Sequence, residues 1–258
     1  MMTPASPGDS TAAPTGTVQS VTRAFVLLEA LSAAGGQETL AVLAMRTGLA
    51  VPTVHRLLGT MHRLGYVRQL DDRSYALGAG LIGLGRQAIP PIADAAHPLL
   101  KRLEELFHET ANLAVLDGDL VLYAGQVASR HLMRMFTETG RRVLPHSTGV
   151  GKAMLSTMPE PKVRALVERT GLPRFTPSTL TDVEAFLQDL RTSRRRGFAA
   201  DDSEQEAGVR CIAVAVRGLG QPAALSVSGP AARITDAIVP RVVEALTAAA
   251  DELQVLVR

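Results

Sequence analysis

The residues whose types could do chemistry lie in two short stretches, and both favour binding over catalysis. Ser226 and Ser228 stand two apart in the apolar run AALSVSG, so on a strand their hydroxyls face the same side. Hydroxyls buried in such a run need hydrogen-bond partners. Gly149-Val150-Gly151 opens a predicted helix, where free backbone N–H groups and the helix dipole favour an anion. These features predict either a pocket for a small carboxylate or, more simply, backbone-bonded serines and a glycine turn.

The other reactive residues form no catalytic or metal-binding pattern. Cys211 lies inside an apolar strand with no His placed to activate it, so we expect a buried thiol or a pocket wall. Residues 149–153 fail the phosphate-loop pattern, because His146 replaces the first glycine and Ala153 the final Ser or Thr. The acidic run 201–206 has no metal-ligand spacing. We therefore expect no cofactor, no metal and no enzymatic activity. The open alternative is an enzyme acting on a small oxo or ureido acid, with an N-terminal domain used only for dimerisation.

Two further motifs have both a functional and a structural interpretation. GAGLIG at 78–83 matches the dinucleotide-binding pattern, but the strand before it is short and polar, and Pro90-Pro91 interrupts the helix after it. Close-packed glycines in a linker helix are the simpler interpretation. Arg194-Arg195-Arg196 could be a second nucleic-acid patch. Because these residues stand just before Gly197, they more simply complement a helix C-terminus.

The stretch Leu40–Tyr66 predicts two short helices joined by a tight turn. In the second helix Pro52 suits the first position, and apolar residues recur at helical spacing, namely Val54, Leu57, Leu58, Met61 and Leu64. The opposite face carries Thr53, His55, Arg56, Thr60, His62 and Arg63. One apolar and one donor-rich face suit a helix that packs on a core and enters a DNA major groove, although many helical hairpins never touch DNA.

The neighbouring segments strengthen the DNA interpretation. A helix expected from about residue 20 turns inward Val21, Ala24, Phe25, Leu28 and Leu31. Residues 66–68 and 74–77 flank a polar turn and predict a hairpin, so three helices and a wing make a winged helix–turn–helix. From Arg46 to Arg73 there are five Arg and two Asp, a surplus of three, whereas the whole chain has a net charge of +2. Local basicity of this kind suits a DNA-reading unit.

Composition restricts the class of protein. The 258 residues are 46% hydrophobic and 20% charged, which suits one large or two ordinary domains with a real core. A single cysteine excludes an intrachain disulfide and favours a reducing, cytoplasmic compartment. Neither a secretion signal nor a membrane-spanning run is apparent, so no membrane partner is expected. Residues 1–16 are rich in Pro, Ser, Thr, Ala and Gly and are expected to form a disordered tail.

From residue 111 onward, strand and helix patterns mix without regular alternation. Strands are expected at 111–116, 120–127, 131–136, 211–217 and 223–228. Helices are expected at 92–108, 149–158, 162–170, 183–196 and 234–256. This order predicts an α+β domain around an antiparallel sheet.

The chain resembles the IclR family of bacterial transcriptional regulators over about residues 18–258. The N-terminal resemblance rests on VQSVTRAFVLLEAL (18–31), TGLAVPTVHRLL (47–58) and YALG (75–78). The stronger C-terminal resemblance rests on LPHSTGVGKAML (144–155), RRGFAADDSEQEAGVRCIAV (195–214) and AALSVSGPAARIT (223–235). It implies a winged helix–turn–helix over 17–78, a linker helix over 79–92 and a GAF-like effector-binding domain over 93–258. It also implies a homodimer or homotetramer on a pseudo-palindromic double-stranded DNA operator.

The resemblance also implies which residues contact DNA. Positions carried over from the family are Thr53, His55, Arg56 and Thr60, and the basic residues Arg63, Arg68 and Arg73 complete the expected set. Arg56 is the strongest candidate, because a guanidinium can bind guanine bidentately or clamp a phosphate. The family often has a Ser or a Lys–Ser pair where this chain has Val51-Pro52, so that hydroxyl contact is lost here.

Within the family, the chain most resembles the branch that responds to glyoxylate or allantoate, through HLMRM (131–135), DDSEQEAGVRC (201–211) and SVSGP (226–230). That branch implies effector contacts from Leu132, Met135, Val143, Gly149, Val150, Asp201, Val209, Cys211, Ser226 and Ser228. Leu132, Met135 and Val143 would form an apolar wall. An ionised Asp201 would repel the effector's carboxylate, so it should meet a donor at the other end, either a hydrate hydroxyl or a ureido N–H. The expected protein is a repressor of a catabolic operon that such an acid releases from DNA.

Overall fold

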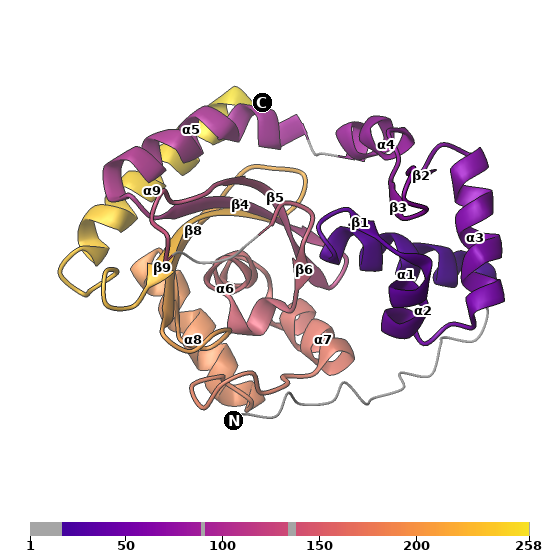
Figure 1. Ribbon diagram of the computed structural model, residues 1–258. Coiled ribbons are helices and arrows are strands. Elements are labelled where there is room, and N and C mark those ends of the chain that lie inside the picture. The colour runs from indigo at the N-terminus through magenta and orange to yellow at the C-terminus, as the bar shows by residue number, and fades with distance from the viewer. Residues whose placement is uncertain (1–16, 89–90, 134–137, 258) are drawn as a thin grey trace. The chain divides into compact units, whose positions relative to one another are not determined.

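The chain folds as two compact units, divided between Ala88 and Ile89, and each has its own hydrophobic core (Figure 1). This computed structural model describes residues 17–88, 91–133 and 138–257. The tail predicted at 1–16 lies outside the described residues. Of the described helices, none combines the length and the apolar character needed to cross a membrane.

The first unit contains three packed helices and a small sheet. The helices are α1 (Gln19–Ala33), α2 (Leu40–Thr47) and α3 (Val51–Arg63). The antiparallel sheet has the order β1-β3-β2 and consists of β1 (Gln37–Glu38), β2 (Val67–Gln69) and β3 (Tyr75–Leu77). Gly48 ends α2 in the left-handed conformation that the tight turn into α3 requires. The winged helix–turn–helix prediction is confirmed.

The buried face of α1 agrees with the predicted one at Ala24, Leu28 and Leu31 but differs from it at two other positions. Leu27 and Leu31 are fully buried in the core of this unit. Val21 and Phe25, which we expected to point inward, are 53% and 60% exposed. Because α1 carries apolar residues on both sides, helical periodicity alone could not decide which side packs against α2 and α3.

Two of the three glycines in the GAGLIG stretch, Gly78 and Gly80, are closely packed, whereas a Cβ on Gly83 would meet no atom within 4 Å. A Cβ at Gly78 would collide with the Gly65 carbonyl oxygen, and a Cβ at Gly80 would lie 3.0 Å from the same atom. The helix α4 (Gly80–Ala88) then begins, and the sheet of this unit is antiparallel. The close-packing interpretation therefore fits Gly78 and Gly80 but not Gly83.

The second unit is built on a six-stranded antiparallel sheet with the order β6-β5-β4-β9-β8-β7. Its strands are β4 (Thr110–Asp117), β5 (Leu120–Val127), β6 (Arg142–Val143), β7 (Ala199–Asp202), β8 (Val209–Val216) and β9 (Ala223–Pro230). Its helical segments are α5 (Pro91–Phe107), the 3-10 turn η1 (Pro145–Ser147), α6 (Gly149–Ser156), α7 (Glu160–Thr170), α8 (Val183–Arg196) and α9 (Val239–Leu256). The α+β prediction is confirmed.

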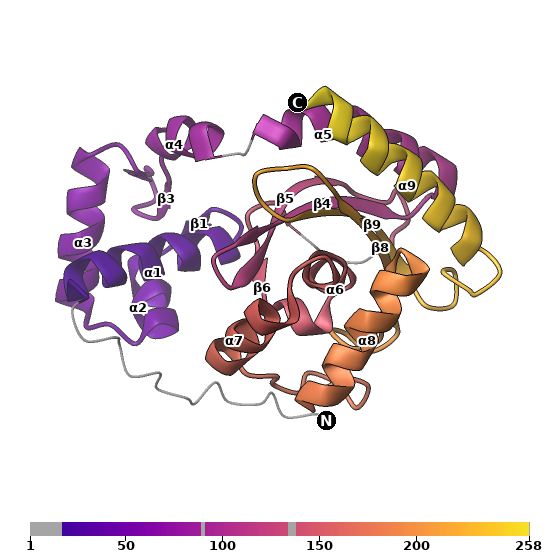
Figure 2. The same ribbon diagram turned by 180° about the vertical axis from the view of Figure 1, so that it is seen from behind.

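Helices cover both faces of the six-stranded sheet (Figure 2). On one face α5 and α9 pack through an apolar layer that includes Leu100, Leu113 and Leu246. The other face curls around α6, which packs on it through Val150 and Met154, with α7 and α8 beyond. Because strand side chains alternate between the faces, alternate residues of the central strands point toward α6.

Some element predictions in this unit are wrong. Residues 131–133 form bends where a strand was expected, and 134–136 of that segment lie outside the described residues. Ser129 explains the bend, since its Oγ donates to the His108 carbonyl and accepts from the His131 N–H. The last helix begins at Val239 instead of 234. The strands β6 and β7 are unpredicted because one is very short and the other ends in two aspartates.

Candidate functional site

The exposed face of α3 presents the predicted DNA-reading side chains. Val54, Leu58 and Met61 are buried in the core of the first unit, which directs the opposite face outward. The predicted residues on that face are the exposed His55, Arg56, Thr60 and Arg63 and the half-buried Thr53. Pro52 is the second residue of α3, one position later than predicted, and its missing N–H still leaves no helical bond unmade because it lies in the first turn.

The hydroxyl of Thr60 is already engaged within α3. Its Oγ1 donates to the Arg56 carbonyl oxygen at 3.0 Å, and Arg63 Nη2 lies 3.4 Å from it as a donor. The hydroxyl proton is therefore donated to the helix backbone, and Thr60 Oγ1 can then only accept a hydrogen bond from another group. Arg56 is the better candidate for reading a base.

The wing is held by a short polar network at its turn. Asp72 Oδ1 accepts from the Ser74 N–H at 2.9 Å and from Ser74 Oγ at 2.5 Å, and these bonds lower the pKa of the Asp72 carboxyl. The next residue, Arg73, has a φ of 63°, in the left-handed region. Both Arg68 on β2 and Arg73 at the tip are exposed. The wing therefore presents two exposed cations.

Strand register places the predicted effector residues in two adjacent rows on the α6 face of the large sheet. One row crosses four strands as Asp201, Cys211, Ser228 and Thr110. The neighbouring row crosses five as Ala199, Ala213, Ser226, Asn112 and Gln126. Apart from the half-buried Gln126, the polar members of both rows are at most 2% exposed. A buried polar cluster of this size on a sheet face requires an explanation.

Three residues that the sequence patterns did not single out belong to this cluster. Asn112 Nδ2 lies 3.1 Å from Ser228 Oγ and 3.4 Å from Ser226 Oγ, and Gln126 Nε2 donates to Asn112 Oδ1 at 3.1 Å. Tyr123 is buried on the same face, where burial raises the pKa of its phenol. The available signal was the alternation of polar residues with apolar ones along β4, which marks one polar face.

The N-terminus of α6 lies directly against β8. Thr148 caps the helix, since its Oγ1 accepts the Gly151 N–H at 3.1 Å. A Cβ on Gly149 would lie 2.9 Å from Cys211 Sγ and 3.1 Å from the Cys211 carbonyl oxygen, so glycine is the residue that fits there. Burial raises the pKa of the Cys211 thiol to about 12, so the thiol stays protonated and unreactive. Cys211 is a buried thiol, as expected.

The apolar wall is not assembled as predicted. Leu132 is fully exposed, because the bend at 131–133 replaces the strand that would have turned it inward. Met135 lies outside the described residues. Val143 on β6 is half-buried and packs with the α6 side of the core, where Val150 is fully buried. Val209 is half-buried at the start of β8, opposite Pro230.

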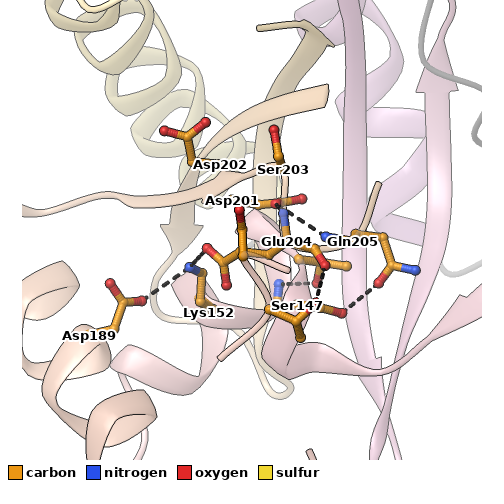
Figure 3. Close-up of polar contacts among 12 residues, drawn as sticks. Ser147, Lys152, Asp189, Asp201, Asp202, Ser203, Glu204 and Gln205 are labelled. Carbon is orange, nitrogen blue, oxygen red and sulfur yellow. Dashed lines mark hydrogen bonds and ion pairs between the residues drawn. The ribbon is translucent and has the colours of Figure 1, made fainter. Parts of the chain in front are cut away.

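Asp201 organises the loop that follows β7 (Figure 3). Its Oδ1 accepts from the backbone N–H groups of Glu204 at 2.7 Å and of Gln205 at 3.4 Å. The same loop reaches η1, because Ser147 Oγ donates to Gln205 Oε1 at 2.5 Å. Burial is the main cause that raises the pKa of Asp201, to about 7. The assumption that this carboxyl is simply ionised therefore fails near neutral pH, where it can donate as well as accept.

A buried ion cluster fixes the other side of this loop. Lys152 on α6 is 1% exposed, and its Nζ lies 2.5 Å from Glu204 Oε1 and 3.2 Å from Asp189 Oδ2 on α8 (Figure 3). Burial raises the pKa of Glu204, and the Lys152 charge opposes that shift. One lysine thus ties α6, α8 and the loop of Asp201 together.

Comparison with known proteins assigns both units. The IclR helix-turn-helix domain matches residues 20–71, and the C-terminal domain of the bacterial transcriptional regulator IclR matches residues 89–255. The chain belongs to the IclR family of bacterial transcriptional regulators. The resemblance inferred from the sequence motifs is confirmed, and so is the expectation of a regulator and not an enzyme.

Relatives of this IclR-family chain include two curated repressors. It is 38% identical to the transcriptional repressor IclR of Escherichia coli and 39% identical to the acetate operon repressor of Salmonella typhimurium. Each match covers 89% of this chain and 86% of the relative. A solved IclR homologue from Microbacterium hydrocarbonoxydans, complexed with 4-hydroxybenzoate, is 27% identical to this chain with a TM-score of 0.77. The match covers 92% of this chain and 98% of the homologue.

The arginine run of this IclR-family chain serves structure. Arg194 donates from Nε to the Ser156 carbonyl at 2.5 Å and from Nη2 to the Met158 carbonyl at 2.6 Å, so these bonds satisfy carbonyls at and just after the end of α6. Arg196 donates to the Phe198 carbonyl and lies over that ring, 4.3 Å from its centroid. These contacts disfavour a second nucleic-acid patch. Among the described residues, no group of three or more His, Cys, Asp or Glu is arranged to hold a metal ion.

Asp201→Asn should change how the stability of this IclR-family regulator depends on pH. The fold raises the pKa of Asp201 from 3.8 to about 7, so its contribution to stability is complete below about pH 4 and is lost as the pH rises through 7. Asparagine mimics the neutral acid and can still accept from the Glu204 N–H. The free energy of unfolding of the variant relative to the native chain should therefore rise by on the order of 4 kcal/mol between about pH 4 and pH 8.

Urea denaturation at a series of pH values measures this difference. Asp202→Asn is the matched control, since Asp202 is exposed on the same strand. A difference between Asp201→Asn and the native chain that is constant with pH would contradict the role of burial.

Lys152→Met should strongly destabilise the second unit. The substitution keeps the apolar stem but leaves the buried carboxylate of Glu204 and the half-buried carboxylate of Asp189 without their cation. Removing one partner of a buried ion pair costs about 3–5 kcal/mol. Lys162→Met, at an exposed site on α7, should change the free energy of unfolding by less than about 0.5 kcal/mol. Equal effects in chemical denaturation would mean that the ion cluster contributes nothing.

Proposed function

We propose that this regulator is a repressor of a catabolic operon, which a small carboxylate such as glyoxylate or allantoate releases from its operator. The observation that carries the proposal is the buried polar cluster of Asn112, Ser226 and Ser228, on the sheet face that α6 covers, in a chain that also has a DNA-reading helix. The names of the two curated relatives support repression. The 4-hydroxybenzoate complex of a homologue supports a carboxylate as effector.

DNA recognition is assigned to α3 and the wing. Arg56 reads a base, with Thr53 and His55 beside it and Thr60 as an acceptor. Arg63 on α3 and Arg68 and Arg73 on the wing contact phosphates, which position the helix without reading sequence. Since the surplus in this stretch is only three charges, one copy makes few phosphate contacts, and useful affinity requires two or more copies on one operator.

The exposed side of α1 supports a homodimer or homotetramer. Val18, Val21 and Phe25 follow one another at spacings of three and four residues and are 65%, 53% and 60% exposed. An apolar stripe of this kind, rimmed by polar residues, marks an interaction surface. A second copy of the chain is the partner we propose, on a pseudo-palindromic operator whose half-sites match the symmetry of the dimer.

The effector is proposed to meet donors at one end and Asp201 at the other. Its carboxylate accepts from Ser226, Ser228 and the backbone N–H groups at the start of α6, at Gly149 and Val150. The far end meets Asp201, which near neutral pH both accepts from a ureido N–H or hydrate hydroxyl and donates to an oxo group. Cys211, Val143 and Val209 complete the lining, together with Leu132 and Met135 in the effector-bound arrangement.

Release from DNA requires the effector to bind one arrangement of the oligomer better than another. We assign residues 17–78 to DNA reading, 79–92 to the linker and 93–258 to effector binding. Effector binding energy is then transmitted through the linker to the spacing of two recognition helices.

Selection of DNA from a library of genomic fragments tests the proposal. The full chain should enrich a pseudo-palindromic sequence, and glyoxylate or allantoate should lower the enrichment while acetamide should not. An enriched sequence that no small acid affects would overturn the effector part. If the native chain enriched no fragment more strongly than the Arg56→Ala variant does, the DNA part of the proposal would be overturned.

A further inference from the structure

We propose that Asn112 is a positioning residue that directs the Ser228 hydroxyl proton toward the effector and thereby selects a carboxylate. This inference rests on the proposed function of the same site. Asn112 lies on β4 and Ser228 on β9, two strands that pair directly, and both side chains are 1% exposed. The effector class that follows is one whose bound end only accepts hydrogen bonds.

The direction of the Asn112 amide decides the chemistry. Its Nδ2 faces both serines, at 3.1 Å from Ser228 Oγ and 3.4 Å from Ser226 Oγ. An amide nitrogen only donates, so both serine oxygens act as acceptors in these contacts. Each hydroxyl keeps its own proton free to be donated elsewhere.

Gln126 holds the amide in this direction. Its Nε2 donates to Asn112 Oδ1 at 3.1 Å from the next strand, β5. With Oδ1 occupied by that donor, turning the Asn112 amide over would place two N–H groups against each other. The pair of amides thus forms a relay that runs from the half-buried Gln126 to the buried serines.

Ser228 is the nearer of the two serines to the orienting amide. Asn112 Nδ2 lies 3.1 Å from Ser228 Oγ but 3.4 Å from Ser226 Oγ. In the part of the chain that the structure describes, Ser228 Oγ accepts from Asn112 and donates to no residue, although it is buried. A buried donor without an acceptor is costly, so the Ser228 proton is matched to an acceptor that a ligand brings.

The surroundings of Ser228 fit a carboxylate. Cys211 pairs with Ser228 across strands β8 and β9, and its sulfur contacts Gly149 at the start of α6. An acceptor that reaches the Ser228 proton is therefore close to the helix end that favours a negative charge. A primary amide of the same shape would present an N–H₂ group to donors on one side, so the site should reject it.

Calorimetric titration of the full chain with glyoxylate and with its primary amide, 2-oxoacetamide, tests the proposal. The native chain should bind the acid at least about 10-fold more tightly than the amide. Asn112→Leu keeps the site uncharged but removes the amide that directs the Ser228 hydroxyl. It should weaken acid binding about 10-fold and leave amide binding unchanged, so the discrimination is lost. If Asn112 had a purely structural role, the substitution would weaken the binding of the acid and of the amide equally.

A double-mutant cycle with Ser228→Ala shows whether Asn112 acts through Ser228. The serine substitution should weaken glyoxylate binding in the native chain and have little effect in Asn112→Leu. Gln126→Leu, at a half-buried site, should weaken glyoxylate binding in the same way but to a smaller extent. This variant replaces Asn112→Leu in the test if Asn112→Leu does not fold. Gln188→Glu on α8 is a surface control.

Two kinds of failure are distinguishable. Additive effects of Asn112→Leu and Ser228→Ala, or equal losses for acid and amide, overturn the positioning role and leave the effector site standing. Absence of binding of glyoxylate, allantoate and 4-hydroxybenzoate to the native chain overturns the proposed effector function, and this inference with it.

Discussion

Arg56→Ala is expected to abolish sequence-selective operator binding while leaving effector binding intact. Arg56 is exposed on the side of α3 opposite the buried Val54, Leu58 and Met61, so the substitution removes a guanidinium without disturbing the core. Loss of one bidentate base contact costs about 1–3 kcal/mol, which is roughly 5- to 150-fold in affinity for each half-site. With two copies on one operator, the loss applies twice. Binding to unrelated DNA should change only slightly, so the two affinities should converge.

The matched control is Arg241→Ala, which removes the same side chain from an exposed position in α9. Its operator affinity should equal that of the native chain in fluorescence anisotropy at fixed salt. The prediction fails if Arg56→Ala retains the native ratio of operator affinity to affinity for unrelated DNA. That result would move base reading to Thr53, His55 or the wing.

The Ser226→Ala, Ser228→Ala double variant is expected to stay on its operator in the presence of effector. Two hydroxyl donors to a charged carboxylate are removed, and hydrogen bonds to charged groups contribute about 1.5–3 kcal/mol each. Effector affinity should therefore fall by about 100-fold or more, while operator affinity without effector remains native. The substitutions also leave Asn112 Nδ2 without its described partners, so the thermal midpoint should fall by a few degrees.

Ser193→Ala serves as the control for the double variant. Ser193 is buried in α8, and its Oγ has no hydrogen-bond partner among the described residues. This variant loses a buried serine hydroxyl but should respond to glyoxylate as the native chain does. Normal release of the double variant from DNA by the native effector would show that the pocket is misplaced.

Local patterns predicted the DNA-reading unit well, because its elements are short and contiguous. Pro52 at the start of α3, Gly48 at the end of α2 and the period of Val54, Leu58 and Met61 each act within a few residues. The prediction failed at Phe25, where α1 is apolar on both sides and only tertiary packing chooses the buried side.

The effector site was only partly predictable, because its contacts join residues distant in the chain. Alternation in β9 placed Ser226 and Ser228 on one face, but their partner Asn112 is more than a hundred residues earlier and no local pattern connects them. Similarly, the ionisation of Asp201 depends on burial beside Glu204 and Lys152, which a sequence does not show. The exposed Leu132 follows from a bend that Ser129 makes with His108.

Regulation requires that operator and effector oppose each other's binding. Thermodynamic linkage makes this coupling reciprocal, with typical magnitudes of about 1–3 kcal/mol, or 5- to 150-fold. An effector that bound both arrangements of the oligomer equally would leave the DNA affinity unchanged. The proposed repressor must therefore show two effector affinities, one free and one on DNA.

The most direct test measures glyoxylate binding to the full chain by calorimetry, first free and then saturated with its selected operator. The proposal predicts that operator weakens glyoxylate binding, and that glyoxylate weakens operator binding by the same factor, at least about 5-fold. Identical glyoxylate affinities with and without operator would contradict the account of a ligand-released repressor.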